Sequence, residues 1–202
     1  MYRLFESIKV SEGEIYHWEL HRQRMYSSLH NIYGEEHILE AIERTFSEKP
    51  SHGLYKLRII YDHRRFQMEY NPYVIRTIRK LYLKHHDTII YDHKYSDRTQ
   101  LNQLTQNLLA DEDILIIKNG MLTDSSYSNV ALFDGSHWFT PSQPLLKGIK
   151  RKWLIDQHEM LEKDIMESEI RNYKKIAFIN AMMDLGELTI DTNSIITSAN
   201  SV

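Results

Sequence analysis

Between a β-rich run and a helix pattern, the chain carries the stretch Tyr91-Asp92-His93-Lys94-Tyr95-Ser96-Asp97-Arg98. The β-rich run covers residues 78–90, and apolar residues recur at helical spacing over residues 99–109. A single lysine in a loop is usually a solvated surface group. Lys94 differs from such a lysine because a histidine precedes it and Arg98 follows four residues later. We therefore treat Lys94 as the first candidate site residue.

A second polar stretch follows a short apolar strand at residues 114–117. It reads Gly120-Met121-Leu122-Thr123-Asp124-Ser125-Ser126-Tyr127-Ser128-Asn129. Alone, it predicts only a hairpin followed by a serine-rich turn. Further along, the chain carries Thr140-Pro141 and then Leu146-Lys147-Gly148-Ile149-Lys150-Arg151. The order and spacing of these segments make them more specific than an isolated glycine motif.

The composition bounds the class of protein. A chain of 202 residues can bury one sizeable core or two small ones. Its hydrophobic content of 42% and charged content of 26% are ordinary for a soluble globular protein. The net charge of -3 gives no basic footprint for nucleic acid or for an anionic membrane. Without a signal-peptide pattern or a membrane-spanning run, we expect a cytoplasmic protein that binds neither nucleic acid nor membrane.

Cysteine and histidine usage argues against a metal centre. The sequence has no cysteine, which excludes disulfides, thiolate-bound zinc and a thiol nucleophile. Among the 11 histidines, only His85 and His86 are adjacent, and none belongs to an H-E-x-x-H arrangement. We interpret the histidines mostly as surface residues and predict no metal site.

The first 73 residues predict a small α+β domain. Residues 5–10 alternate apolar and polar side chains, as a half-buried strand does, and residues 15–16 begin its return strand. Apolar spacing predicts helices over residues 18–33, closed by Gly34, and around residues 38–46. Two strands follow at residues 54–61 and 66–70. Asn71-Pro72-Tyr73 is the predicted domain boundary, because proline interrupts both strand and helix.

Residues 74–202 predict a larger C-terminal domain that carries the lysine. We expect strands around residues 81–83, 114–117, 129–133, 137–140 and 175–180. Asn119-Gly120 predicts a tight hairpin turn. Helices are expected over residues 99–109, 149–161 and 166–173, and the polar tail from Thr192 is expected to fray.

Taken together, these motifs resemble the class IV aminotransferases, the pyridoxal 5'-phosphate enzymes of fold type IV. The family pattern places Gly120, Thr123, Asn129 and Val130 in register with the Thr-Pro pair and with the Leu-x-Gly-Ile-x-Arg segment. The branch that it resembles most is aminodeoxychorismate lyase. Three segments carry that likeness: Phe5-Glu6-Ser7-Ile8-Lys9-Val10, His93-Lys94 with Arg98, and Asn180-Ala181-Met182-Met183.

The resemblance extends from Phe5 to about Asp191 and implies a fold. It implies a two-domain α/β (α+β) protein of the D-amino acid aminotransferase type, with a shortened N-terminal domain. It also implies a homodimer and a cofactor site in the cleft between the two domains.

The family's lysine forms a Schiff base with the cofactor, and Lys94 matches it. The phosphate needs amide N–H groups and a cation. The resemblance assigns these roles to Arg24, in His21-Arg22-Gln23-Arg24-Met25, and to Ile149, Lys150, Ala181 and Met182.

Two further roles are less direct. An anion must keep the pyridine nitrogen protonated, and Asp124 stands where the family has glutamate, one methylene longer. A substrate carboxylate calls for a planar guanidinium, and Arg98 is our candidate. For Arg58 we favour a structural role.

The resemblance leaves three functions open. A lyase would release pyruvate from aminodeoxychorismate and form 4-aminobenzoate, a step of the folate pathway, with Lys94 as general base. An aminotransferase would act on branched-chain or D-amino acids. A D-amino acid enzyme should offer an arginine near the end of the strand at residues 54–61, where this chain has Tyr61-Asp62. A non-catalytic relative would serve only as a subunit.

Overall fold

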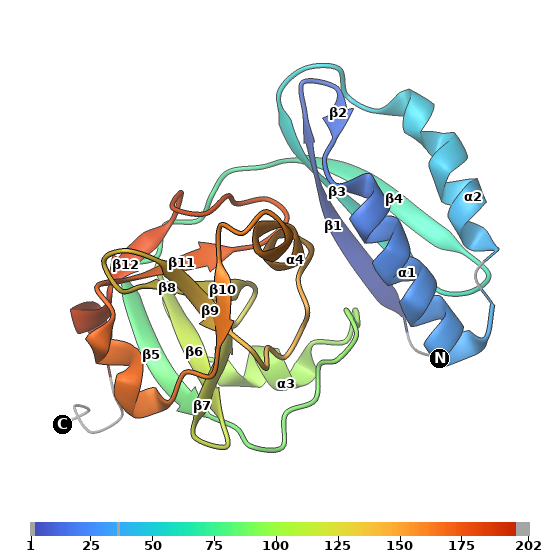
Figure 1. Ribbon diagram of the computed structural model, residues 1–202. Helices are drawn as coiled ribbons and strands as arrows, with labels where there is room; N and C mark the ends of the chain where they lie inside the picture. The colour runs from blue at the N-terminus through green and yellow to red at the C-terminus, as the bar shows by residue number, and fades with distance from the viewer. Residues whose placement is uncertain (1–2, 36, 197–202) are drawn as a thin grey trace. The chain divides into compact units, whose positions relative to one another are not determined.

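The computed structural model describes residues 3–35 and 37–196, and the chain is a mixed α/β protein (Figure 1). It divides into two compact units. The first comprises Met1–Val74 with His93–Asp97, and the second comprises Ile75–Asp92 with Arg98–Val202. The sequence analysis placed the lysine in the C-terminal domain. In the structure, the lysine segment belongs to the first unit.

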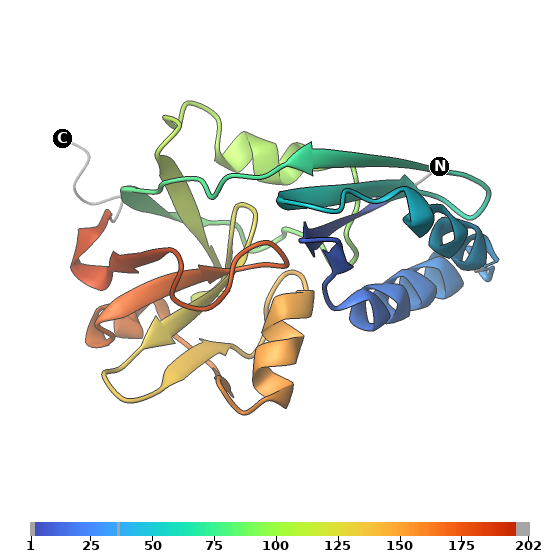
Figure 2. The ribbon, with the colours of Figure 1, turned by 90° about the horizontal axis from the view of Figure 1, so that it is seen from above.

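The first unit is a four-stranded antiparallel sheet with helices on one face (Figures 1 and 2). The strand order is β2-β1-β3-β4. The strands are β1 (Leu4–Ser11), β2 (Glu14–Ile15), β3 (Leu54–Tyr61) and β4 (Phe66–Pro72). The helices are α1 (Trp18–Tyr33), α2 (Ile38–Arg44) and the short 3-10 helix η1 (Thr45–Glu48).

Period-2 alternation decides which side chains of this sheet meet the helices. On β1, Leu4, Ile8 and Val10 belong to the core that α1 and α2 complete. On β3 the same core takes Leu57, Ile59 and Tyr61. Phe5 and Ser7 of β1 and Arg58 of β3 therefore face the other side of the sheet, which α1 and α2 do not cover.

The lysine segment joins the first unit through the outer edge of β1. The amide N–H of Phe5 donates to the carbonyl of Lys94 at 2.9 Å, and that of Ser96 donates to Arg3 at 2.7 Å. An isolated bridge pairs Leu4 with Tyr95. These backbone bonds explain why a segment distant in sequence clusters with the N-terminal strands.

In its described residues, the second unit contains a nine-stranded sheet and two α-helices (Figure 1). The main strand order is β10-β9-β8-β7-β6-β5-β13, and β11 pairs with β8 and β12. In chain order, its elements are β5 (Lys80–His85), α3 (Thr99–Leu104), β6 (Glu112–Lys118), β7 (Met121–Ser125), β8 (Asn129–Phe133), β9 (Trp138–Pro141), α4 (Ile149–Asp156), β10 (Leu161–Lys163), η2 (Glu167–Asn172), β11 (Lys175–Ile179), β12 (Thr189–Asp191), η3 (Thr192–Ser194) and β13 (Ile195–Ile196).

The two faces of this sheet contribute side chains to different hydrophobic clusters. Leu115 and Ile117 of β6 enter a large cluster with residues of β5, β8 and β11. Ile114 and Ile116, on the opposite face of β6, pack with Leu101 of α3. A third cluster forms where α4 packs on residues of β8 and β11. Helices α3 and α4 thus pack on the face of the sheet opposite the large cluster.

Local pattern located most elements, but several ends differ from the prediction. Helix α3 ends at Leu104 and α4 at Asp156, both earlier than predicted. Strand β4 continues to Pro72, which an edge strand permits because its outer side needs no N–H donor. The predicted frayed tail is ordered through Ile196, where β13 pairs with β5. Its last six residues, 197–202, lie outside the described range.

The Asn119-Gly120 turn is confirmed. Asn119 has φ 51° and Gly120 has φ 75°, the paired positive values of a type I′ hairpin, here joining β6 to β7. Among the described helices, none is long and apolar enough to cross a membrane.

Candidate active site

The predicted site residues fall into two groups, one in each unit. In the first unit, Lys94 extends over the ring of Phe5, with Nζ 4.7 Å from the ring centroid. The segment around the lysine is also tied to α1, because Nδ1 of His93 lies 3.1 Å from the hydroxyl of Ser28. The lysine segment is therefore fixed both by its backbone hydrogen bonds to β1 and by the side chain of His93.

Arg24 extends from α1 toward β1 and meets a buried carboxylate. Its Nε donates to Oε1 of Glu6 at 2.8 Å, and its Nη2 donates to Oε2. The Glu6 side chain is fully buried, whereas that of Arg24 is 15% exposed. Two parallel bonds orient a guanidinium more strictly than one, so Glu6 fixes the plane of Arg24.

His21 completes this network. Its Nδ1 lies 2.7 Å from Oε2 of Glu6, and the ring is fully buried. Burial lowers the pKa of His21, and the opposing pull of Glu6 does not reverse that shift. A neutral ring that donates from Nδ1 presents Nε2 as an acceptor, and Nε2 is buried with no hydrogen-bond partner in the structure.

Sequence reasoning missed Glu6 and His21. The sequence analysis interpreted the histidines mostly as surface residues, and His21 is an exception, because it is 0% exposed and lies on the buried face of α1. A signal for Glu6 was present: an acidic residue occupies a period-2 position between Leu4 and Ile8, both of them core residues. A charge at a core position calls for a partner.

Asp124 lies on β7 in the second unit and is buried. Its Oδ1 accepts from the side-chain amide of Asn129 at 2.7 Å, and its Oδ2 accepts from the N–H of Leu146 at 3.0 Å. Burial raises the pKa of Asp124 to about 6, although both hydrogen bonds oppose this. Each carboxylate oxygen can accept two hydrogen bonds, so the group can still take another donor.

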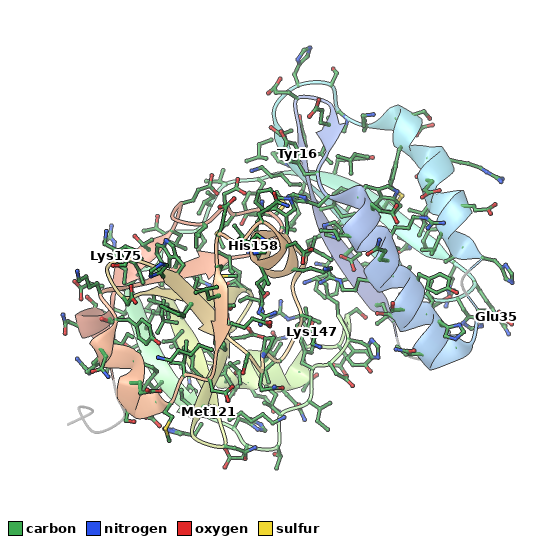
Figure 3. All side chains as sticks on the ribbon, in the orientation of Figure 1. Tyr16, Glu35, Met121, Lys147, His158 and Lys175 are labelled. Carbon is green, nitrogen blue, oxygen red and sulfur yellow. The ribbon has the colours of Figure 1, made fainter. Side chains whose placement is uncertain are left out.

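Helix α4 begins beside Asp124. Gly148 caps it in an extended conformation, and a Cβ at Gly148 would lie only 1.9 Å from Oδ1 of Asn129. The exposed Lys147 precedes it in the loop (Figure 3). The first-turn N–H groups of Ile149 and Lys150 have no intrahelical acceptor and carry the positive end of the helix dipole. This is the donor arrangement that a phosphate needs.

The side chain of Lys150 is not free to bind a phosphate. It is buried, forms an ion pair with Asp184, and lies 4.9 Å from the ring centroid of Trp153. Its predicted contribution to the phosphate is therefore confined to its backbone N–H. The same ion pair connects α4 to the turn that contains Ala181 and Met182.

That turn is closed by Asn180. The N–H of Met183 donates to the carbonyl of Asn180 at 3.1 Å, and the N–H of Met182 donates to its side-chain oxygen at 2.8 Å. Since the Met182 amide is already engaged, Ala181 is the better amide donor of the predicted pair.

Arg98 stands at the start of α3. Its Nη2 donates to the carbonyl of Ser126, in the turn between β7 and β8, and its Nε is buried without a partner. Part of the guanidinium thus holds the chain together.

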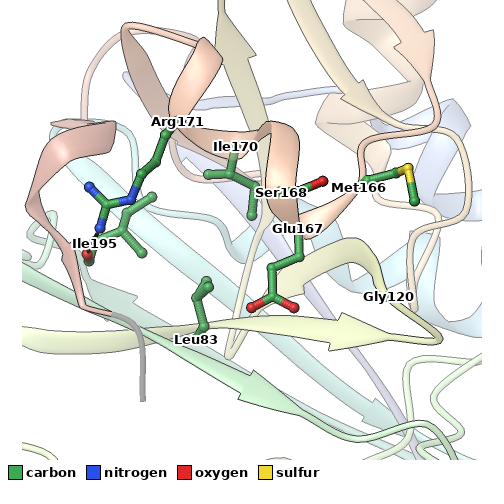
Figure 4. Close-up of a pocket in the computed structure, with 8 residues that line it drawn as sticks. All are labelled: Leu83, Gly120, Met166, Glu167, Ser168, Ile170, Arg171 and Ile195. Carbon is green, nitrogen blue, oxygen red and sulfur yellow. Dashed lines mark hydrogen bonds between the residues drawn. The ribbon is translucent and has the colours of Figure 1, made fainter. Parts of the chain in front are cut away.

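A cavity of about 480 Å³ lies elsewhere in the second unit (Figure 4). None of the predicted site residues lines it, and its one arginine, Arg171, donates to the carbonyl of Ile195 at 3.0 Å. Within the described residues, no group of three or more His, Cys, Asp or Glu side chains is placed to hold a metal ion.

The model of the amino-transferase class IV family matches residues 3–189 of this chain. The chain belongs to the class IV aminotransferases. A Haemophilus influenzae protein of uncharacterised function is 35% identical over 190 residues, covering 92% of this chain and 100% of that protein. Class IV aminotransferases are pyridoxal-phosphate-dependent enzymes, and this chain is an enzyme of that class.

Solved structures of other proteins share the fold. A crystal structure from Haemophilus somnus, provisionally named a 4-amino-4-deoxychorismate lyase, has 30% identity and a TM-score of 0.81, covering 92% of this chain and 98% of its own. A hypothetical aminotransferase from Mycobacterium tuberculosis, in its PLP-bound form, has 14% identity and a TM-score of 0.73 over 96% of this chain and 81% of its own. The second likeness concerns the fold alone.

The residues of this class IV enzyme fit pyridoxal phosphate in charge and donor type. Lys94 offers an amine, and Asp124 an ionisable carboxyl with remaining acceptor capacity. Arg24 and the first-turn amides of α4 are suited to a phosphate. The absence of a Cβ at Gly148 keeps the start of α4 close to Asn129, which in turn holds Asp124.

Proposed function

We propose that this enzyme is a pyridoxal-phosphate-dependent 4-amino-4-deoxychorismate lyase that forms 4-aminobenzoate and pyruvate. The observation that carries the proposal is the match to the Haemophilus somnus protein of that provisional name, which extends over 98% of its chain at 30% identity. The lyase-like segments around Phe5, Lys94 and Asn180 support it.

The cofactor, when bound, supplies an aldehyde for the substrate amine and a ring that withdraws electrons from the amino-bearing carbon. Lys94 then removes the proton from that ring carbon and returns a proton to the enolpyruvyl group as pyruvate leaves. The two products together contain every atom of the substrate, so no oxidant or second substrate is needed. Asp124 would stabilise a positive charge at the pyridine nitrogen. Arg24 in the first unit, and the Ile149 amide in the second, are each suited to bind a phosphate.

The end of β3 argues against the D-amino acid transaminase alternative. Tyr61 is 2% exposed and packs in the helix-side core. Asp62 accepts from the N–H groups of Arg64 and Arg65, at 2.9 and 3.1 Å. Neither residue is available to bind a substrate carboxylate, and neither is an arginine.

The proposal includes a place in the cell and an assembly. We propose a homodimer that acts in folate biosynthesis in the cytoplasm. Light scattering of the purified protein tests the assembly, because a dimer has twice the mass of the chain.

The reaction itself is tested by offering 4-amino-4-deoxychorismate with pyridoxal phosphate and no keto acid. We expect 4-aminobenzoate and pyruvate in equal amounts. Amino transfer from an amino acid to a keto acid, without this activity, would instead establish a transaminase. If neither reaction occurs and borohydride fixes no cofactor to Lys94, the protein is a non-catalytic subunit.

A further inference from the structure

The ring of Phe5 contacts two cations. Phe5 lies on the face of the first unit's sheet that α1 and α2 do not cover, and it is 4% exposed. The guanidinium carbon of Arg58 lies 4.6 Å from its ring centroid, and Nζ of Lys94 lies 4.7 Å from it. The two cationic groups are therefore no more than about 9 Å apart.

The backbone fixes this arrangement. Ser7 of β1 faces Arg58 of β3, which makes Arg58 a diagonal neighbour of Phe5 on the same sheet face. The lysine segment is attached to the opposite edge of β1 through the Phe5 N–H. Arg58, from β3, and Lys94, from the lysine segment, thus approach the ring from opposite sides of β1.

Arg58 is weakly engaged by the protein. Its side chain is 30% exposed, and its ion pair with Glu69 is long, with 3.9 Å between Nε and Oε1. Glu69 is itself 59% exposed, so this pair contributes little. The contact involves Nε rather than the two terminal nitrogens. A carboxylate could therefore bind the guanidinium without displacing a strong partner.

The spacing selects among substrates, given the proposed lyase function. In an α-amino acid, the carboxylate carbon is two bonds from the amino nitrogen. In 4-amino-4-deoxychorismate, the ring carboxylate is five bonds away, across a six-membered ring. Because the substrate amine reacts at Lys94, a guanidinium held up to about 9 Å from it, across β1, suits the distant carboxylate.

We propose that Arg58 is a substrate-binding residue that holds the carboxylate on the ring carbon opposite the amino group. This inference rests on the proposed lyase function for the identity of the substrate. It replaces the structural role favoured by the sequence, and it assigns the ring carboxylate to Arg58 rather than to Arg98, whose Nη2 is bound to Ser126.

The test is binding of two ring amines to the cofactor-loaded protein by titration calorimetry. One probe is 4-aminobenzoate, and the other is 4-aminobenzamide, which has the same shape without the charge. Loss of a charge-assisted pair in Arg58→Gln should weaken 4-aminobenzoate binding on the order of 30-fold. Binding of 4-aminobenzamide should change less than about threefold, and Arg58→Lys should bind 4-aminobenzoate with intermediate affinity.

Lys56→Gln is the matched control. Lys56 lies on the same face of β3 and over an aromatic ring, 5.9 Å from the centroid of Tyr73. It should leave both affinities unchanged. Equal weakening by the Lys56 and Arg58 variants would reduce the effect to general surface charge and overturn the proposal.

The remaining outcomes separate this proposal from the lyase function. A selective loss of 4-aminobenzoate binding in Arg98→Gln but not in Arg58→Gln overturns the assignment of the carboxylate to Arg58. Failure of the wild type to bind 4-aminobenzoate also overturns it. If the wild type does not convert 4-amino-4-deoxychorismate but Arg58→Gln still shows the selective loss, the lyase function fails and Arg58 stands as a carboxylate-binding residue.

Discussion

Oε2 of Glu6 lies 2.7 Å from Nδ1 of His21, and neither side chain is exposed to solvent. The same carboxylate binds the guanidinium of Arg24. Burial opposes ionisation of Glu6, but the charge of Arg24 and the hydrogen bonds from both neighbours hold the pKa of Glu6 at about 2. An ionised, buried carboxylate therefore orients the arginine proposed to bind phosphate.

This network predicts an acid-dependent stability. Since the pKa of Glu6 is depressed from its ordinary value of 4.5, its contribution is present above about pH 4.5 and lost as the pH falls toward 2. The shift corresponds to about 3 kcal/mol. Glu6→Gln should lower the free energy of unfolding at neutral pH and flatten its loss in acid. Urea unfolding at several pH values measures both.

The control is Glu40→Gln. Glu40 forms an exposed ion pair with Arg44 in α2, which contributes at most about 0.5 kcal/mol. An equal loss of stability in the Glu6 and Glu40 variants would show that the buried network stabilises the fold no more than an exposed ion pair does.

Lys94→Ala should abolish turnover and the visible absorption of bound cofactor, because it removes the amine that binds the cofactor aldehyde. After borohydride reduction, mass spectrometry of the wild type should locate the cofactor on Lys94. Lys9→Ala provides the comparison, since Lys9 also lies over an aromatic ring, 5.5 Å from the centroid of Tyr16. It should keep activity and label. A cofactor label on another lysine would refute the assignment of Lys94.

Elements set by local periodicity were predictable. The apolar spacing predicted where α1 begins, and Gly34, which adopts a positive φ, predicted where it ends. The alternation of apolar and polar residues predicted β1. Ends set by distant partners were not. Helix α4 ends at Asp156, the chain turns at His158 with φ 59°, and Leu161 then pairs in parallel with Phe139 of β9. No feature near α4 in the sequence announces that pairing.

For the candidate site, the sequence indicated residues but not all of their contacts. Motif spacing predicted Lys94, Asp124 and the start of α4 as site residues, and these roles stay predictions. It could not show that Lys150 turns to Asp184, because a long cationic side chain on a short helix can reach several partners. Nor could it show Arg58 beside Phe5, since that proximity depends on the register between β1 and β3.

Asp124→Asn should remove a pH dependence of the opposite sign. Burial raises the pKa of Asp124 from 3.8 to about 6, so the folded protein holds the proton more tightly than the unfolded chain. In the cofactor-free protein, this contribution is present below about pH 4 and lost as the pH rises through 6, a change of about 3 kcal/mol. The asparagine variant should lack this slope in urea unfolding.

The same variant should reduce turnover on the order of ten- to a hundredfold, because the pyridine nitrogen loses a charged partner. Its measurement is the steady-state rate at saturating cofactor. Unchanged turnover would mean that another group supplies the anion, while the unfolding slope would still report on Asp124.

Gly148→Ala should destabilise the start of α4 by steric conflict alone. The φ of Gly148 is -71°, which alanine adopts without strain, but the new methyl group would lie 1.9 Å from Oδ1 of Asn129. Moving Asn129 also breaks its hydrogen bond to Asp124. We expect a loss of about 1–3 kcal/mol in the free energy of unfolding, as overpacking usually causes.

A double-mutant cycle separates this conflict from any general effect on the helix. In an Asn129→Ala background the obstructing amide is gone, so adding Gly148→Ala should cost much less than it does in the wild type. The coupling free energy between the two substitutions should be similar in size to the loss of stability that Gly148→Ala causes in the wild type. If the two substitutions were simply additive, the clash with Asn129 would not be the reason for glycine at this position. The amide geometry at the start of α4 would then need another explanation.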